Sequence, residues 1–292
     1  MKTPTSIKDS SYAVYGLGVS GKSTLKFLKK KKVKNIYIWD DKKNNNKKYN
    51  LFKKALDKVD YIVISPGINI QKTKLKLTLS RNKKKIITDL DLFYMQKISL
   101  KSIVVTGTNG KSTVCKLVKH ILKINKLDAQ LGGNIGEPIL DLKINKKTIV
   151  IIEASSFQLA HAKFIKPNIA AILNISTDHL DWHNTMTNYR NSKFNIFSKQ
   201  DSKDVALLTS KKLIKLFKEN NYSSKLKIIK KDFLNIKIKT KITNNYLISK
   251  PNLENLKFAY QISKILKIKE KIFLKAVNNF KGLPHRHEIF LK

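Results

Sequence analysis

The sequence has very little of several features that would assign it to a class of protein. It contains one cysteine, Cys115, so no internal disulfide can form, and this predicts a reducing, cytoplasmic environment. No apolar run approaches the roughly 20 residues that a membrane span needs. The first residues also lack the apolar stretch of a secretory signal. These absences exclude a disulfide scaffold, and we expect no membrane insertion.

Arginine is almost absent from a chain that is otherwise strongly basic. Lysine and arginine number 60 against 20 aspartates and glutamates, a net charge of +40, yet the only arginines are Arg81, Arg190 and Arg286. Sites that recognise nucleic-acid bases, or that bind phosphate through two parallel hydrogen bonds, favour arginine over lysine. We therefore attribute the charge to a drift toward lysine, asparagine and isoleucine. We expect no specific nucleic-acid partner, only weak and salt-sensitive attraction of polyanions.

Apolar runs typical of strands alternate with helical patterns, which predicts an α/β protein with parallel sheets. Strands are expected at 12–15, 35–39, 61–64, 102–105, 148–152, 168–173 and 205–208. Helices are expected at about 21–30, 91–96, 186–197, 253–266 and 269–280, a loop at 42–48, and short strands within 225–250. We predict a Rossmann-like parallel-sheet domain over residues 1–98, followed by a P-loop-type central ATPase domain over residues 99–292.

Two glycine-rich loops are candidates for holding phosphate. The first, Gly16-Leu-Gly18-Val-Ser-Gly21, stands between a predicted strand and a predicted helix, the context that a dinucleotide fingerprint requires. With Lys22-Ser23 it also completes the pattern G-x-x-x-x-G-K-S. Asp40 ends the next predicted strand, where a ribose contact would lie. From these residues alone a nucleotide diphosphate, NAD and a mere tight turn all stay open.

The second loop directly follows a predicted strand and opens a predicted helix. Its backbone N–H groups can form a nest for an anion, and Lys111 can reach the phosphates of a nucleotide. Ser112 or Thr113 can offer a hydroxyl to Mg²⁺. The pattern predicts a site for the phosphates of a nucleotide, formed by Gly107, Thr108, Asn109, Gly110, Lys111, Ser112 and Thr113.

Six segments, in order along the chain, resemble the Mur ligases, the ATP-dependent enzymes that build the peptide of bacterial cell-wall precursors. The segments are GTNGKST at 107–113, LGGNIG at 131–136, EASSFQL at 153–159, NISTDHLD at 174–181, YRNSK at 189–193 and GLPHR at 282–286. The SSFQL element is similar to that of the family members that add D-glutamate to UDP-N-acetylmuramoyl-L-alanine. The resemblance covers essentially the whole chain.

The resemblance implies a reaction and the residues that carry it. ATP phosphorylates the substrate carboxylate, and the amine of D-glutamate attacks the acyl phosphate, which leaves an amide, ADP and phosphate. Catalytic roles are implied for Lys111, Glu153, His179 and Lys193. Magnesium contacts are implied for Ser112, Glu153, His179 and Lys193, the last as a carbamate.

The family resemblance also implies two sets of binding residues. Further ATP contacts are expected from Asn252, Asn255, His285 and Arg286. Contacts to the UDP-substrate are expected from Gly18, Val19, Ser20, Asp40, Ser65, Pro66, Gly67, Asn134, Ser156 and His179. In this family the first loop holds a uridine diphosphate, so the NAD interpretation weakens, and nothing beyond that loop supports a nicotinamide dehydrogenase.

The sequence departs from the family pattern in two places. Ser249 and Pro251 replace the glycine and the histidine that the family has ahead of Asn252, and Pro251 cannot donate a backbone hydrogen bond, which predicts weaker ATP binding. The chain ends at Lys292, where the family continues. We expect the C-terminal D-glutamate-binding domain to be absent from this chain, with a separate chain as one source of it. A non-catalytic remnant that binds a UDP-sugar or a nucleotide is the alternative interpretation.

Overall fold

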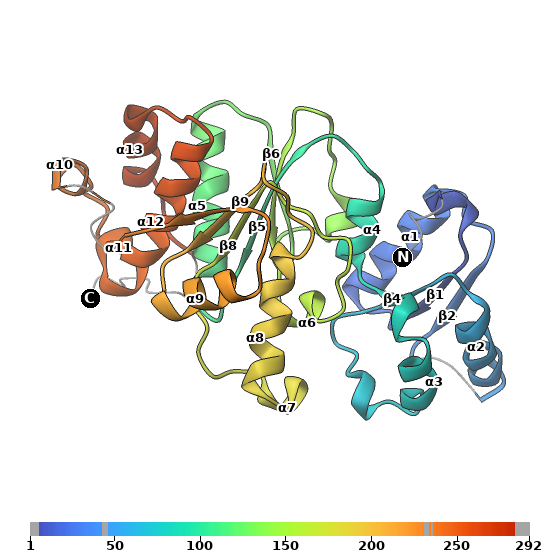
Figure 1. Cartoon of the computed structure of the whole chain (residues 1–292). Helices are drawn as coiled ribbons and strands as arrows, with labels where there is room; N and C mark the ends of the chain where they lie inside the picture. The colour runs from blue at the N-terminus through green and yellow to red at the C-terminus, as the bar shows by residue number, and fades with distance from the viewer. Residues whose placement is uncertain (1–5, 43–45, 231–233, 235, 284–292) are drawn as a thin grey trace, which may run out of the picture.

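The computed structural model describes residues 6–42, 46–230, 234 and 236–283, and it shows two parallel sheets covered by helices (Figure 1). The four-stranded first sheet has the order β2-β1-β3-β4, and the six-stranded second sheet has the order β10-β9-β8-β5-β7-β6. Every paired strand runs parallel to its neighbour. The predicted α/β class is therefore confirmed.

The first sheet forms because short apolar runs are separated by helices that cover both of its faces. Its strands are β1 (Tyr12–Tyr15), β2 (Ile36–Trp39), β3 (Tyr61–Ile64) and β4 (Ile86–Ile87). Its helices are α1 (Val19–Lys30), α2 (Asn46–Lys58), α3 (Lys76–Arg81) and α4 (Asp89–Met95). Successive side chains of β1 point to opposite faces, so Tyr15 packs with Phe52 of α2, whereas Val14 packs with Leu28 of α1.

The second sheet has more strands than the first, and the second glycine-rich loop follows its central strand, β5. Its strands are β5 (Lys101–Thr106), β6 (Ala129–Gly133), β7 (Ile149–Glu153), β8 (Ile169–Ile172), β9 (Val205–Leu208) and β10 (Lys225–Ile228). The burial of β7 and β8 is continuous, as expected for central strands covered on both faces.

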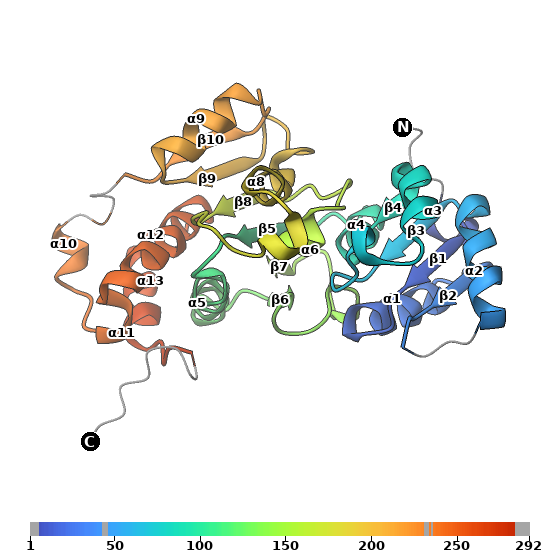
Figure 2. The same ribbon diagram turned by 90° about the horizontal axis from the view of Figure 1, so that it is seen from below.

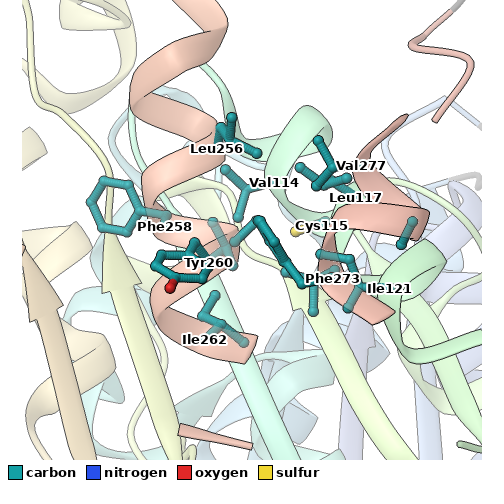
Figure 3. Packing of buried hydrophobic residues seen from close by; sticks show 14 of the residues in the cluster. Val114, Cys115, Leu117, Ile121, Leu256, Phe258, Tyr260, Ile262, Phe273 and Val277 are labelled. Atoms are coloured by element: carbon teal, nitrogen blue, oxygen red, sulfur yellow. The ribbon is translucent and has the colours of Figure 1, made fainter. Parts of the chain in front are cut away.

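Helices cover both faces of the second sheet (Figure 2). One face carries α5 (Lys111–Ile124), α12 (Lys250–Ile265) and α13 (Glu270–Asn278). Val114, Leu117 and Ile121 recur along α5 at helical spacing and meet Leu256 and Phe273 from the other two helices (Figure 3). The other face carries α6 (Ser156–Leu159), α7 (Leu180–His183), α8 (Met186–Phe194) and α9 (Lys211–Glu219).

Three sequence expectations about local structure were wrong or incomplete. Between 225 and 250 the described residues form one strand, β10, and then the short helices α10 (Ile236–Lys239) and α11 (Asn245–Ile248) instead of several strands. The expected loop at 42–48 already enters α2 at Asn46. The segment 131–136 begins as the edge strand β6, which the sequence did not predict because glycine weakens a strand pattern.

The two sheets occupy different stretches of the chain, and α4 lies between them (Figure 1). The division into domains at residue 98 stays a prediction. Short 3₁₀ turns complete the described elements at Ile7–Asp9, Ile70–Lys72, Lys83–Lys85, Ile139–Asp141 and Asn195–Phe197. Among the described helices none combines the length and the apolar character needed to span a membrane.

Candidate active site

The second loop, residues 107–113, turns sharply between β5 and α5. Gly107 and Gly110 have positive φ angles of 157° and 86°, and Gly110 is the N-cap of α5. A Cβ on Gly110 would collide with the side-chain amide of Asn255, so only glycine fits this position. Asn174, at the end of β8, fixes the loop from the other side, because its Oδ1 accepts a hydrogen bond of 2.9 Å from the Asn109 N–H.

Two lysine ammonium groups converge on one carbonyl of this loop. Lys111 Nζ donates to the carbonyls of Gly107 and Thr108 at 2.9 and 2.8 Å. Lys193 Nζ, from α8, donates to the same Gly107 carbonyl at 2.8 Å. The structure thus brings these two predicted site residues together at one loop. The Lys111 ammonium beside a nest of backbone N–H groups suits a polyphosphate.

Lys193 is an unusual lysine because its side chain is buried. The residue is 1% exposed, and its ammonium lies 4.5 Å from the centre of the Tyr189 ring. Burial, and next the positive charge of Lys111, lower the pKa of Lys193 to about 7. A large fraction of this amine is therefore neutral near neutral pH, and a neutral amine is the form that can react with CO₂.

Glu153 ends β7 directly beside the beginning of the second loop. It pairs in register with Val105 of β5 and is 1% exposed. Its Oε1 accepts a hydrogen bond of 2.9 Å from Asn134 Nδ2, whereas its Oε2 is buried and has no hydrogen-bond partner among the described residues. A buried carboxylate oxygen without a donor is costly unless a cation completes it.

The residues around Glu153 fit Mg²⁺. Ser112, in the first turn of α5, is 7% exposed and supplies a hydroxyl of the kind that Mg²⁺ takes beside phosphate oxygens. Within the described ranges no three His, Cys, Asp or Glu side chains form a metal centre by themselves. A carboxylate and a hydroxyl are oxygen donors that suit Mg²⁺, which usually keeps waters and substrate phosphates among its other ligands.

His179 precedes α7 in the segment between β8 and α8, and Ser156 begins α6 after β7. His179 has a positive φ of 52°, and its ring packs 4.7 Å from that of Phe157. Its Nε2 lies 3.4 Å from Asp178 Oδ2. The Ser156 hydroxyl shares a 3.0 Å hydrogen bond with His183 Nε2, and burial lowers the pKa of His183 to about 4, so that this imidazole is neutral.

The first loop, residues 16–21, is closed by two side chains from neighbouring strands. Ser65 Oγ donates to the Gly16 carbonyl at 2.8 Å, and Asp40 Oδ2 accepts a hydrogen bond of 2.6 Å from the Leu17 N–H. Pro66 and Gly67 follow in the turn after β3. The outer face of the loop is open, because no atom lies within 4 Å of the Cβ position of Gly18 and Val19 is 74% exposed. Ser20 follows in the first turn of α1.

Of the four further residues expected to contact ATP, the structure describes Asn252 and Asn255. Asn255 Nδ2 donates to Asn252 Oδ1 at 3.1 Å, and Asn252 Nδ2 donates to the Tyr246 carbonyl at 3.0 Å. Both asparagines lie in α12, whose start covers Gly110. Pro251 occupies the first turn of that helix, where a backbone N–H has no helical acceptor, so its missing donor breaks no helical bond. His285 and Arg286 lie outside the described residues.

Sequence reasoning missed the residues that support these groups. Tyr189 Oη lies 3.0 Å from Thr108 Oγ1, and its ring faces Lys193 one helical turn away. The spacing i, i+4 on a helix was the available signal for this pair. A cleft of about 460 Å³ between the two sheets was also missed, and its lining includes Asn69, Trp182 and His183. Residues from such separate segments leave no local pattern in a sequence.

Comparison with known proteins agrees with this geometry. Residues 105–273 match the Mur ligase middle domain, and residues 10–87 match the Mur ligase MurD-like N-terminal domain. UDP-N-acetylmuramoylalanine–D-glutamate ligase of Rickettsia bellii is 34% identical over an alignment of 311 positions, which covers 96% of this chain and 68% of that protein. The ligase of the same name from Aquifex aeolicus is 33% identical, and the alignment covers 95% of this chain and 66% of that protein. The chain thus spans about two thirds of the length of these relatives.

Solved structures share the fold at low identity. The UDP-N-acetylmuramate:L-alanyl-gamma-D-glutamyl-meso-diaminopimelate ligase of Neisseria meningitidis superimposes with a TM-score of 0.59 at 14% identity, over 94% of this chain and 99% of that chain. The MurF ligase of Thermotoga maritima in complex with ADP superimposes with a TM-score of 0.52 at 15% identity, over 96% of this chain and 68% of that chain. With two matched domains and relatives above 30% identity, this chain belongs to the Mur ligase family.

Proposed function

We propose that this chain carries the ATP site and the UDP-substrate site of a ligase that joins D-glutamate to UDP-N-acetylmuramoyl-L-alanine. The observation that carries the proposal is the meeting of Lys111 and Lys193 on the Gly107 carbonyl, at the end of the strand that pairs with Glu153, whose Oε2 has no hydrogen-bond partner within the described part of the chain. The names of the relatives support the choice of substrates.

The reaction has two steps, and the first uses the second loop. The carboxylate of the L-alanyl group attacks the γ-phosphorus of ATP, the bond to the bridging oxygen of ADP breaks, and an acyl phosphate forms. Such a transfer depends on positioning and on charge stabilisation more than on covalent help. Lys111 supplies a positive charge to the phosphates, while the N–H groups of residues 107–113 hold them.

The second step makes the amide. The amine nitrogen of D-glutamate attacks the acyl carbon, the carbon–phosphate oxygen bond breaks, and the nitrogen loses a proton. Asn134 and Ser156 face the carboxylate end of the substrate in this proposal, since Asn134 already binds Glu153 and Ser156 binds the neutral His183.

Magnesium fits the residues beside the loop. Ser112 and Glu153 would hold one ion, and His179 with Lys193 would contribute to a second. Mg²⁺ supplies neutralisation of the phosphate charge. A bare ammonium repels a cation, so the proposal requires Lys193 as a carbamate: its neutral nitrogen bonds to the carbon of CO₂ and releases a proton. The pKa of about 7 favours that neutral nitrogen.

The first loop takes the uridine diphosphate. Gly18, Val19 and Ser20 present the open face of the loop and the start of α1 to the diphosphate, where helix N–H groups favour an anion. Asp40, Ser65, Pro66 and Gly67 border it. The proposal places the reaction in the cytoplasm, in keeping with the single, unpaired Cys115.

The test follows phosphate release and amide formation by the chain with ATP, Mg²⁺, UDP-N-acetylmuramoyl-L-alanine and D-glutamate. Amide product supports the whole proposal. ATP turnover that requires the UDP-substrate but gives no amide supports the first step only. If a folded protein gives neither signal, the ligase assignment is wrong for this chain, and a non-catalytic UDP-sugar- or nucleotide-binding role replaces it.

A further inference from the structure

Asp89 is a buried carboxylate that none of the roles above uses. It is the first residue of α4 and is 4% exposed. Burial raises the pKa of its carboxyl group above the usual value. An acid in such a place must be held by donors, because an unpaired buried charge is strongly unfavourable. The identity of those donors shows what the residue connects.

Two of the groups that contact Asp89 lie on helices that belong to different sheets of the molecule. α1 packs against α4, and the side chain of Ser20, in the first turn of α1 beside the first loop, interacts with the Asp89 carboxyl group. Gln158 Nε2, from α6 of the second sheet, donates to Asp89 Oδ1 at 3.4 Å. The Leu90 N–H donates to the same oxygen at 3.0 Å. Asp89 is thus the shared acceptor between the proposed UDP loop and the segment that follows β7.

Gln158 continues this connection toward the reacting groups. Its Oε1 accepts hydrogen bonds from the Ser155 N–H and hydroxyl at 3.1 and 3.2 Å, and its own N–H donates to Ser155 Oγ at 3.2 Å. Ser155 lies two residues after Glu153 and one before Ser156. Every member of this chain of contacts beyond Ser20 is buried, so water does not compete for its hydrogen bonds.

We propose that Asp89 is a positioning residue that couples occupation of the first loop to the geometry of the ATP site through Ser20, Gln158 and Ser155. This inference rests on the proposed function, since it needs a uridine diphosphate at one loop and ATP at the other. A diphosphate that orders the start of α1 fixes the Ser20 hydroxyl. Asp89 and Gln158 then hold the turn after β7, which carries Glu153 and Ser156.

Asp91, two residues further along α4, provides a matched control. It is fully buried and also crosses between the sheets, because its Oδ1 accepts hydrogen bonds of 2.7 Å from the N–H groups of Lys163 and Phe164. Its Oδ2 accepts from the Thr88 N–H at 2.8 Å. Asp91 therefore ties the two halves together without a described hydrogen bond to either loop.

The experiment measures binding by calorimetry with two probes, UDP and the β,γ-methylene analogue of ATP with Mg²⁺. For the full chain we expect saturating UDP to tighten the ATP analogue by about fivefold or more, within the usual range of coupling between sites. The coupling factor is the ratio of the affinities for the ATP analogue with and without saturating UDP. In Asp89→Asn we expect this factor to fall to within about twofold of one. Each probe alone still binds to this variant within about threefold of its affinity for the unmodified chain. Asn keeps the size of the side chain but places an N–H₂ against a donor.

The controls separate this inference from the proposed function. Asp91→Asn lowers Tm but keeps the coupling factor, and Ser20→Ala, which deletes one hydroxyl, loses the factor and serves if Asp89→Asn does not fold. A factor of one in the unmodified chain overturns the inference, as does an unchanged factor in Asp89→Asn or in Ser20→Ala. Failure of the unmodified chain to bind UDP or the ATP analogue overturns the proposed function instead.

Discussion

The two glycine-rich loops have the same place in their sheets but different surroundings. Each follows a strand with neighbours on both sides, β1 in the first sheet and β5 in the second, and each leads into a long helix. Both also contain the triplet Gly-Lys-Ser, at 21–23 and 110–112. The first loop is closed by Asp40 and Ser65, whereas the second is met by the ammonium groups of two lysines.

The difference comes from where each helix begins. Gly110 is the N-cap of α5, so Lys111 is the first helical residue and reaches back to the loop carbonyls. In the first loop the helix already begins at Val19, so Gly21 lies inside α1 and Lys22 is exposed one turn from the start. The same letters therefore place the lysine against its own loop only where the glycine caps the helix.

The largest expected effect comes from removing the lysine of the second loop. Lys111→Ala lowers ATP turnover by about 10³-fold or more, because a charge that stabilises the transferred phosphoryl group is lost. UDP binding is unchanged, since the first loop is untouched. Phosphate release and UDP calorimetry on the same preparation measure both quantities.

Lys22→Ala is the matched control for this substitution. It removes the lysine of the same triplet in the first loop, and we expect ATP turnover to stay within about twofold, as for most exposed substitutions. Equal losses in the two variants, or full turnover in Lys111→Ala, would show that the distinction between the loops is wrong.

A second large effect is expected at Lys193. Lys193→Ala lowers ATP turnover by about 10²-fold, and added bicarbonate does not restore it, because no amine remains to form a carbamate. The unmodified chain, stripped of dissolved CO₂, regains turnover when bicarbonate returns. Lys199→Ala, at an exposed lysine further along the same segment, is the control and keeps its bicarbonate response. A fully active Lys193→Ala contradicts the carbamate.

The pH dependence sharpens the contrast between Lys193 and ordinary lysines. Its pKa is lowered to about 7, so the ammonium predominates below pH 7 and the neutral amine above it. At a fixed concentration of dissolved CO₂, we expect the carbamate to increase by at least about tenfold between pH 6 and pH 8. The ¹³C signal of labelled CO₂ bound to the protein measures it, and a signal that is flat over this range, or that survives in Lys193→Ala, would assign the adduct elsewhere.

Much of the fold was predictable because its strands are short, apolar and regularly separated. The patterns at Tyr61–Ile64 and Ile149–Glu153 identified buried parallel strands, since such strands need no polar face. The edge strand β6 escaped because its glycines carry no β pattern, and α10 and α11 escaped because four-residue helices show no period. Tertiary packing decides elements of this length.

The candidate site was predictable where one residue carries both the motif and the chemistry. Lys111 follows from the glycine-rich loop itself, whereas the resemblance supplied Glu153 and also Lys193, one lysine among many. The sequence could not show that Lys193 is buried against Tyr189, or that Asp89 joins Ser20 to Gln158. Burial and contacts between distant segments depend on the folded chain.

The smallest expected effect separates the two glycines that flank the open face of the first loop. A Cβ at Gly18 meets no atom within 4 Å, so Gly18→Val leaves Tm unchanged and weakens UDP binding by about tenfold, because the side chain occupies the space of the diphosphate. A Cβ at Gly21 would collide with the Gly16 carbonyl, so Gly21→Ala instead lowers the free energy of unfolding by about 1–3 kcal/mol. Thermal unfolding and UDP calorimetry on both variants decide the matter. If Gly18→Val binds UDP as tightly as the unmodified chain, the open face of this loop is not the diphosphate site. The two loops would then differ in their surroundings, but not in the way that a diphosphate ligand of the first loop requires.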